Sequence, residues 1–167
     1  MNNKSETFRI TSELTHGIFN LGLKLFEDDS DVEKFCIENR AINGQSWLAK
    51  DALKLILEKS HRDKVNHFED LLRVRITLFY FEGKPIVVGP YLTEEITIGQ
   101  CIQICNEVDK KGMDAKDLII YYGKYPVIPE SRMEKIIHSI LHTLEIEGLS
   151  EHFTKYKGNT KELFNDN

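Results

Sequence analysis

Two pairs of side chains in the sequence have a spacing that could serve metal or redox chemistry. His138 and His142 stand four residues apart, which places both imidazoles on one face of a helix, as in zinc sites. The residues between them form no HExxH motif and no third ligand is evident, so two polar-face histidines explain the spacing better. Cys101 and Cys105 share this spacing without a CxxC motif and are typical of buried apolar thiols. We therefore predict no metal site and no cofactor.

Catalytic motifs are also missing from the sequence. It contains no glycine-rich phosphate loop of the GxGxxG or GxxxxGK[ST] type and no GxSxG nucleophile elbow. Carboxylates such as Glu94 and Glu95 stand where a helix is expected to begin, and negative charge is favourable there. A general acid and base would need two carboxylates brought together from separate elements, and no pattern indicates such a pair. We therefore predict that the chain is not an enzyme.

One strongly β-forming segment carries most of the candidate ligand-binding side chains. Residues 71–81 read LLRVRITLFYF, and their alternation places Arg73, Arg75 and Thr77 on one face. These groups could meet an anionic ligand, although solvated side chains on a half-exposed sheet are the simpler interpretation. Tyr80 points to the other face, where its hydroxyl needs a partner if it is buried and could line a small-molecule cavity.

A β-hairpin over residues 74–91 positions these side chains and is the clearest structural signal in the sequence. Glu82-Gly83-Lys84 forms its turn, and Gly89-Pro90 ends its return strand. Residues 18–26 fit a strand or a helix equally well. Helical periodicity predicts further helices over residues 31–39, 46–60, 93–106, 114–122 and 130–147. The sequence thus predicts an α/β (α+β) domain, in which helices pack on one face of a small antiparallel sheet, with a PAS-like or GAF-like fold as the options.

Composition indicates one folded domain in the cytoplasm. The 167 residues are 41% hydrophobic and 29% charged, which is a normal globular balance. The formal net charge of −5 argues against direct contact with DNA or RNA. No apolar run approaches the length of a membrane span, the first residues resemble no secretory signal, and three cysteines without framework spacing indicate reduced thiols. We predict a domain over residues 1–149 and a polar tail or linker over 150–167.

Two motifs resemble the N-terminal sensor domain of AraC-type transcriptional regulators from Firmicutes. The first is a strand that ends in Gly89-Pro90-Tyr91 and leads into the acidic helix start Thr93-Glu94-Glu95. The second is a Y-Y-x-x-[LY]-P-V-[IL]-[PS] element before the last helix, which reads YYGKYPVIP over residues 121–129. The resemblance covers about residues 74–144, and residues 1–70 match only in general layout.

The resemblance implies a signal-input domain for transcriptional control, which binds a small molecule or a partner protein. Such a domain precedes two helix-turn-helix motifs, which this chain lacks, so residues 150–167 would begin the linker to them. Tyr91 then joins the candidate ligand-binding residues. We also expect a homodimer through apolar residues exposed on the last helix, namely Ile136, Ile140 and Leu144. The alternative is a stand-alone protein–protein interaction domain without a small-molecule ligand.

Overall fold

The computed structural model describes residues 3–39, 50–108 and 114–155 of the chain. In these ranges one five-stranded sheet has the strand order β1-β4-β3-β2-β5. The elements are α1 (Asn3–Phe19), β1 (Leu23–Leu25), α2 (Asp29–Glu38), α3 (Lys50–Lys59), β2 (Lys64–Glu69), β3 (Arg75–Phe81), β4 (Lys84–Tyr91), α4 (Ile98–Val108), α5 (Ala115–Tyr122), α6 (Glu130–Thr143) and β5 (Ser150–Lys155). The prediction of a mixed α/β domain is confirmed.

The predicted hairpin forms the centre of the sheet. Strands β3 and β4 pair antiparallel, with Phe81 opposite Lys84 across a tight turn. Glu82 and Gly83 occupy this turn with φ of 54° and 79°, a left-handed conformation that glycine adopts without steric cost. Strand β1 extends the sheet beyond β4, and β2 extends it beyond β3, both antiparallel.

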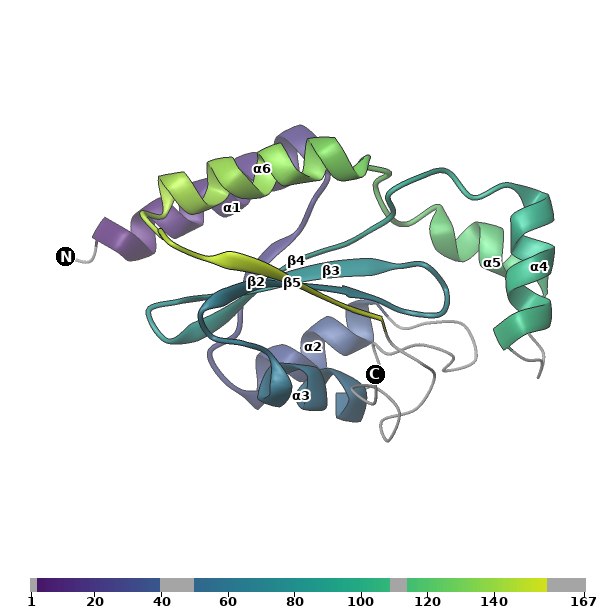
Figure 1. The fold of residues 1–167 in the computed structure, drawn as a ribbon, viewed down its shortest axis with the longest axis horizontal. Helices are drawn as coiled ribbons and strands as arrows, with labels where there is room; N and C mark the ends of the chain where they lie inside the picture. The colour runs from purple at the N-terminus through teal and green to yellow at the C-terminus, as the bar shows by residue number, and fades with distance from the viewer. Residues whose placement is uncertain (1–2, 40–49, 109–113, 156–167) are drawn as a thin grey trace.

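Helices cover both faces of the sheet, so the expectation of helices on one face is wrong. Helices α1 and α6 lie over one face, α2 and α3 lie over the other, and α4 and α5 pack at one end (Figure 1). Strand β3 alternates between the two cores: Ile76 and Leu78 face α2 and α3, whereas Phe79 and Phe81 face α1 and α6. We expected the sheet face that carries Arg75 and Thr77 to be half-exposed, because the sequence does not reveal that α1 packs on that face.

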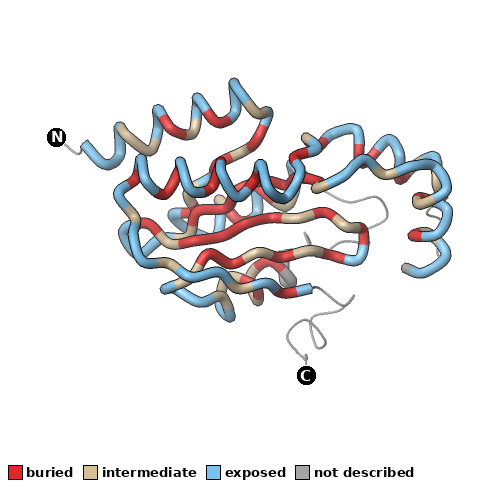
Figure 2. The backbone as a smooth tube through the Cα atoms, turned by 45° about the horizontal axis from the view of Figure 1, so that its top comes forward, coloured by how far each residue is buried: buried red, intermediate tan, exposed pale blue. Residues whose placement is uncertain are grey.

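Two strands were missing from the sequence prediction. Strand β2 lies in a segment with few apolar residues, KVNHFE, which gives a weak strand signal. Strand β5 pairs parallel to β2, with Lys64 opposite Ser150 and Glu69 opposite Lys155. The prediction of a tail or linker is therefore wrong for residues 150–155, while residues 156–167 lie outside the described ranges. Figure 2 shows the buried stretches along the central strands.

The helix boundaries largely follow capping residues. Asp28 caps α2 by accepting hydrogen bonds from the backbone amides of Ser30 and Asp31, and Asp114 caps α5 in the same way through Asp117. The helix predicted from residue 93 begins only at Ile98, and α6 ends at Thr143 rather than at residue 147. Ser46, the predicted cap of the helix over residues 46–60, lies outside the described residues.

Candidate functional site

A bulge at the end of β4 determines where Tyr91 points. Thr77 pairs with Val88 and Arg75 pairs with Tyr91, so β4 contains one residue more than β3 over this stretch. The extra residue reverses the alternation after Val88 and places Tyr91 in the same core as Val88, beneath α6. Gly89 has φ 117°, and the peptide bond between Gly89 and Pro90 is cis. The Gly-Pro-Tyr motif therefore turns a tyrosine to the α1/α6 face.

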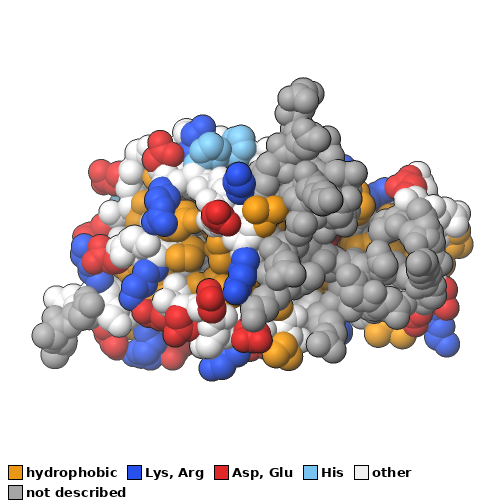
Figure 3. All heavy atoms as spheres, turned by 90° about the horizontal axis from the view of Figure 1, so that it is seen from below, with side chains coloured by type: hydrophobic (Ala, Val, Ile, Leu, Met, Phe, Trp, Pro, Cys, Tyr) orange, Lys and Arg blue, Asp and Glu red, His pale blue; other side chains and the backbone are white. Residues whose placement is uncertain are grey.

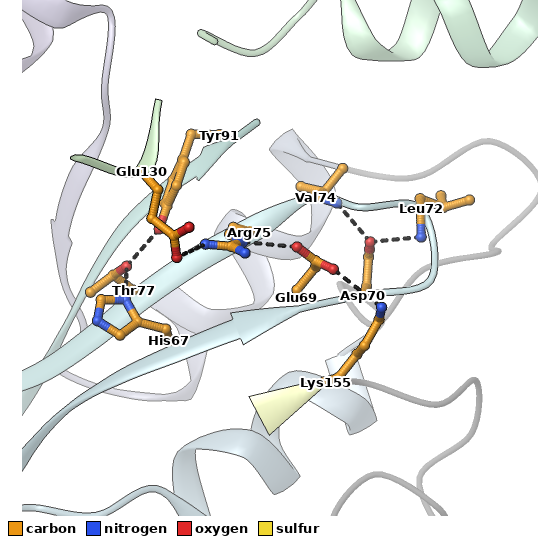
Figure 4. A network of polar contacts seen from close by, with 10 residues as sticks. All are labelled: His67, Glu69, Asp70, Leu72, Val74, Arg75, Thr77, Tyr91, Glu130 and Lys155. Atoms are coloured by element: carbon orange, nitrogen blue, oxygen red, sulfur yellow. Dashed lines mark hydrogen bonds and ion pairs between the residues drawn. The ribbon is translucent and has the colours of Figure 1, made fainter. Parts of the chain in front are cut away.

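A chain of polar side chains links four strands on this face. The Tyr91 hydroxyl lies 2.9 Å from Thr77 Oγ1, which lies 3.0 Å from His67 Nδ1. His67 Nε2 lies in turn 3.0 Å from Glu151 Oε1 at the surface. Thr77 and Tyr91 are buried, and burial raises the pKa of Tyr91 above its ordinary value, so its hydroxyl stays protonated. The residues from Tyr91 to His67 are drawn in Figure 4.

Arg75 joins the sheet to the first turn of α6. Its Nε donates to Glu69 at 2.8 Å, and its Nη1 donates to Glu130 at 3.1 Å (Figure 4). The ring of Phe153 lies 5.0 Å from the guanidinium carbon, and Lys155 pairs with Glu69 at 3.5 Å. Burial alone would lower the pKa of Arg75, but the hydrogen bonds to the two glutamates outweigh it and raise the pKa. Its positive charge is thus balanced within the chain.

A pocket of about 350 Å³ opens beside these groups, between the sheet and the start of α6. Its walls combine apolar and aromatic side chains with three glutamates, Glu130, Glu134 and Glu151. The remaining lining residues are His67, Arg75, Tyr91, Met133, His152 and Phe153. Because Arg75 already has two carboxylate partners, the pocket favours a ligand that donates hydrogen bonds or carries positive charge over an anion.

Three of the five predicted ligand-binding residues meet at this site. Arg75 and Tyr91 line the pocket, and Thr77 lies directly behind Tyr91. Tyr80 lies on the opposite face, where its hydroxyl donates to the Leu57 carbonyl at 3.0 Å. Another contact of that hydroxyl, at 2.6 Å, is with Ser60 Oγ.

Arg73 also lies away from the pocket, because it belongs to the turn between β2 and β3 and not to a strand. Its φ is 66°, and its amide donates to the Asp70 carbonyl at 3.0 Å. The buried Asp70 carboxylate fixes this turn by accepting from the amides of Leu72 and Val74, both at 2.9 Å (Figure 4). The predicted strand over residues 71–81 is therefore wrong at its start.

Sequence reasoning missed several residues of the site. His67 and Glu151 belong to the two strands that were not predicted, so nothing marked them as neighbours. Glu130 was visible as the start of the last helix, but its contact with Arg75 spans 55 positions in the chain. Only the alternation of β2, with Val65 and His67 on one face, could have drawn attention to His67.

The residues predicted to form a dimer interface are buried within the chain. Ile136, Ile140 and Leu144 are 6%, 4% and 4% exposed, and their side chains pack in the core between the sheet and the helices α1 and α6. The premise that they are exposed is wrong, because the apolar stripe of α6 packs on the sheet. Ile136 and Ile140 do reach the floor of a groove between α1 and α6.

The histidine and cysteine pairs form no cluster suited to a metal ion. Among the described residues, no three His, Cys, Asp or Glu side chains lie together in this way. Cys101 is buried and Cys105 half-buried, and burial raises the pKa of both thiols, which keeps them protonated. Within the same ranges, no helix has the length and apolar character needed to span a bilayer.

The two motifs that carry the resemblance lie next to each other. The Leu92 amide donates to the Pro126 carbonyl at 2.9 Å, and the Ile128 amide donates to the Leu92 carbonyl at 2.7 Å. The strand of the first motif ends at Tyr91 in the pocket, and the second motif leads directly into Glu130 at the rim of the pocket. No protein-family model, curated protein or solved structure matches the chain. The chemistry of the site therefore rests on its own geometry.

Proposed function

We propose that this chain is the signal-input and dimerisation domain of a cytoplasmic transcriptional regulator of the AraC type. A small molecule binds in the pocket beside Arg75 and Tyr91, and the signal leaves through α6 toward a DNA-binding part. The domain itself makes no contact with nucleic acid. The mixed charges on the face seen in Figure 3, where acidic and basic side chains are interspersed, support this last point.

The contact between Arg75 and Glu130 is the observation that carries the proposal. Arg75 is anchored by Glu69, whose side chain is 14% exposed, whereas the Glu130 side chain is 76% exposed. A ligand group that competes for the Glu130 carboxylate would break a contact between the sheet and the first turn of α6. The ligand then favours one position of α6 over another, which is the differential affinity that a sensor needs.

The pocket also suggests the class of ligand. Its volume lies at the lower end of the range for small-molecule sites. Three rim carboxylates and the aromatic rings of Tyr91 and Phe153 favour a small amine or another compound rich in hydrogen-bond donors. The inner hydroxyls of Thr77 and Tyr91 are buried and bonded to each other, which supports binding over catalysis.

The two adjacent motifs support the AraC-type part of the proposal. The Gly-Pro-Tyr element orients a pocket residue through its bulge, and the Tyr-Pro-Val-Ile-Pro element sets the start of α6. Both elements thus act at the site that would receive the signal. A reading frame that continues past Asn167 into paired helix-turn-helix motifs is the expected gene structure, and sequencing the locus checks it.

Ligand binding is tested by thermal shift against a library of small amines, sugars, peptides and other metabolites. We expect a compound that raises the melting temperature, because it binds only the folded state. Glu130→Gln and Tyr91→Phe should reduce this shift, whereas Tyr80→Phe, a matched loss of a hydroxyl on the opposite face, should leave it intact. A hit whose shift is unchanged in both pocket variants contradicts the proposed site.

An interaction domain without a small-molecule ligand is the second candidate. It is favoured by exposed apolar side chains on α1, where Ile10, Leu14 and Ile18 are 44%, 57% and 67% exposed. A flat thermal-shift result across the whole library would favour this function. The two candidates differ in whether substitutions in the pocket abolish the response to the signal.

A further inference from the structure

We infer that α1 and α6 form the interface with a second copy of this chain. The surface consists of a ridge and a groove. Ile10, Leu14 and Ile18, the α1 ridge, are spaced four residues apart and lie on one side of α1. Leu14 and Ile18 also form one wall of a groove of about 410 Å³, which runs between α1 and α6 over Ile136 and Ile140. This inference names the surface for the dimerisation included in the proposed function and rests on that part of it.

The ridge and the groove suit each other in shape. Both belong to the same two helices, so a two-fold axis can place the ridge of each copy on the groove of the other. The α6 side of the groove is lined by Ser139 and Thr143, small side chains that leave room for leucine and isoleucine from a facing helix. Leu14 stands in the middle of the ridge and also lines the groove, so it lies at the centre of this surface, and we place the axis beside it.

Charge complementarity favours a second copy of this chain as the occupant of the groove. The groove is basic at one end, where Arg132 and Lys135 line it, and neither forms an ion pair with another described residue. The outer edge of α1 carries Glu6 and Glu13, which both pair with Arg9, leaving one negative charge over the three groups. An α1 helix therefore offers the acidic edge that a basic groove end lacks.

The antiparallel arrangement of the two helices brings these charges together. Helix α6 runs opposite to α1, so it begins where α1 ends (Figure 1). A two-fold axis at Leu14 makes the α1 of the second copy antiparallel to the first α1 and therefore parallel to α6. The part of the second copy's α1 that precedes Leu14, with Glu6 and Glu13, then extends over the end of the groove with Arg132 and Lys135.

The size of the face is adequate for a specific dimer. Helix α1 has 17 residues and is about 25 Å long. With a neighbouring helix about 10 Å away, the pair presents a face on the order of 500 Å² in projection, and its accessible surface is larger. This is the class of a small to standard interface, at roughly 800 Å² per partner.

The test is sedimentation equilibrium of the full chain and its variants. We expect a dimer for the wild type, and Leu14→Glu should raise its dissociation constant about a hundredfold or more, because a carboxylate would be buried in the groove. Ile102→Glu is the matched control, since Ile102 is a similarly exposed isoleucine, 51% accessible, on the remote helix α4. Melting curves check that both variants fold.

A charge exchange makes the test specific to this arrangement. Lys135→Glu should weaken the dimer about tenfold, and adding Glu13→Lys should restore it, because the second substitution returns an opposite charge to the same contact. Lys135 is exposed, so this variant stays informative if Leu14→Glu fails to fold. A monomeric wild type, or a dimer weakened equally by Ile102→Glu, overturns the inference. Ligand binding in the pocket is independent of these outcomes, so its failure would be recognised separately.

Discussion

The two faces of the sheet satisfy their buried polar groups in different ways. On the α2/α3 face, the Asn66 amide group donates to the backbone carbonyls of His61 at 2.9 Å and Leu78 at 3.2 Å, and its oxygen accepts from the His61 amide. On the α1/α6 face, Thr77 and Arg75 are satisfied by other side chains, one of them Glu130 at the surface. Both arrangements pair these groups, with backbone atoms on one face and with side chains on the other.

This difference indicates which face can respond to a ligand. Backbone partners such as His61 and Leu78 cannot rotate away as a side chain can, so the bonds of Asn66 can break only if the backbone itself moves. Side-chain partners can rotate, and a ligand can replace an exposed carboxylate such as Glu130 without disturbing a strand. The α2/α3 face therefore stabilises the fold, and the α1/α6 face offers exchangeable contacts. Substitutions on each face test whether the two faces differ in this way.

The largest effect is expected from a truncation on the α2/α3 face. Leu78 is fully buried there, and Leu78→Ala should lower the free energy of unfolding by about 2–5 kcal/mol through lost burial and a cavity. Denaturant titration measures this change. Ile120→Ala, on an exposed side chain of α5, is the control and should cost far less. Equal losses in both variants would mean that the Leu78 site is not a packed core.

The next effect concerns the bulge that gives the α1/α6 face its tyrosine. Gly89→Ala places a Cβ 3.1 Å from the Arg75 carbonyl in a residue with φ 117°, so we expect a loss of about 2–3 kcal/mol. Gly17→Ala, with open space around the new Cβ in α1, should instead stabilise by about 0.5–1 kcal/mol. Thermal unfolding distinguishes the loss of stability from the gain. A Gly89→Ala variant as stable as the wild type would contradict the conformation described for the bulge.

A smaller effect should follow from Arg75→Met. The substitution leaves the Glu69 carboxylate, 14% exposed, with the exposed Lys155 as its remaining cation, so we expect a loss of about 2 kcal/mol. Adding Glu69→Gln should recover part of it, because the uncompensated negative charge disappears. Chemical denaturation of both single variants and the double variant gives the coupling energy. If the losses of the two single variants add up in the double variant, Arg75 and Glu69 contribute to stability independently of each other.

Local signals explain why the sequence predicted the centre of the fold correctly. The hairpin was recognisable because alternation and turn residues act between neighbours, and Asp114 marked α5 for the same reason. Strand β5 was missed because its pairing with β2 depends on residues about 86 positions away, as the Lys64–Ser150 register shows. Of the site, the sequence supplied Arg75, Thr77 and Tyr91, but their partners come from contacts that have no local pattern.

The smallest effect is a pH dependence at the edge of the pocket. Burial, together with the neighbouring His61 and Lys64, lowers the pKa of His152 below its ordinary value. The unfolded chain therefore takes up a proton at this histidine first, near pH 6.5, and the folded chain only at lower pH. The stabilising difference is present above about pH 6.5 and is lost as pH falls through the folded pKa.

Urea titrations between about pH 7 and pH 5 measure this dependence in the wild type, His152→Gln and His61→Gln. His152→Gln should flatten the decline in stability toward low pH, because the titrating group is gone. His61→Gln should flatten it partly, because the ring 4.5 Å away no longer opposes protonation of His152. Identical slopes in the wild type and His152→Gln would show that protonation of this pocket residue is not linked to folding. A flatter slope would show that protonation of His152, on the β5 strand that also carries the pocket residues Glu151 and Phe153, is linked to folding.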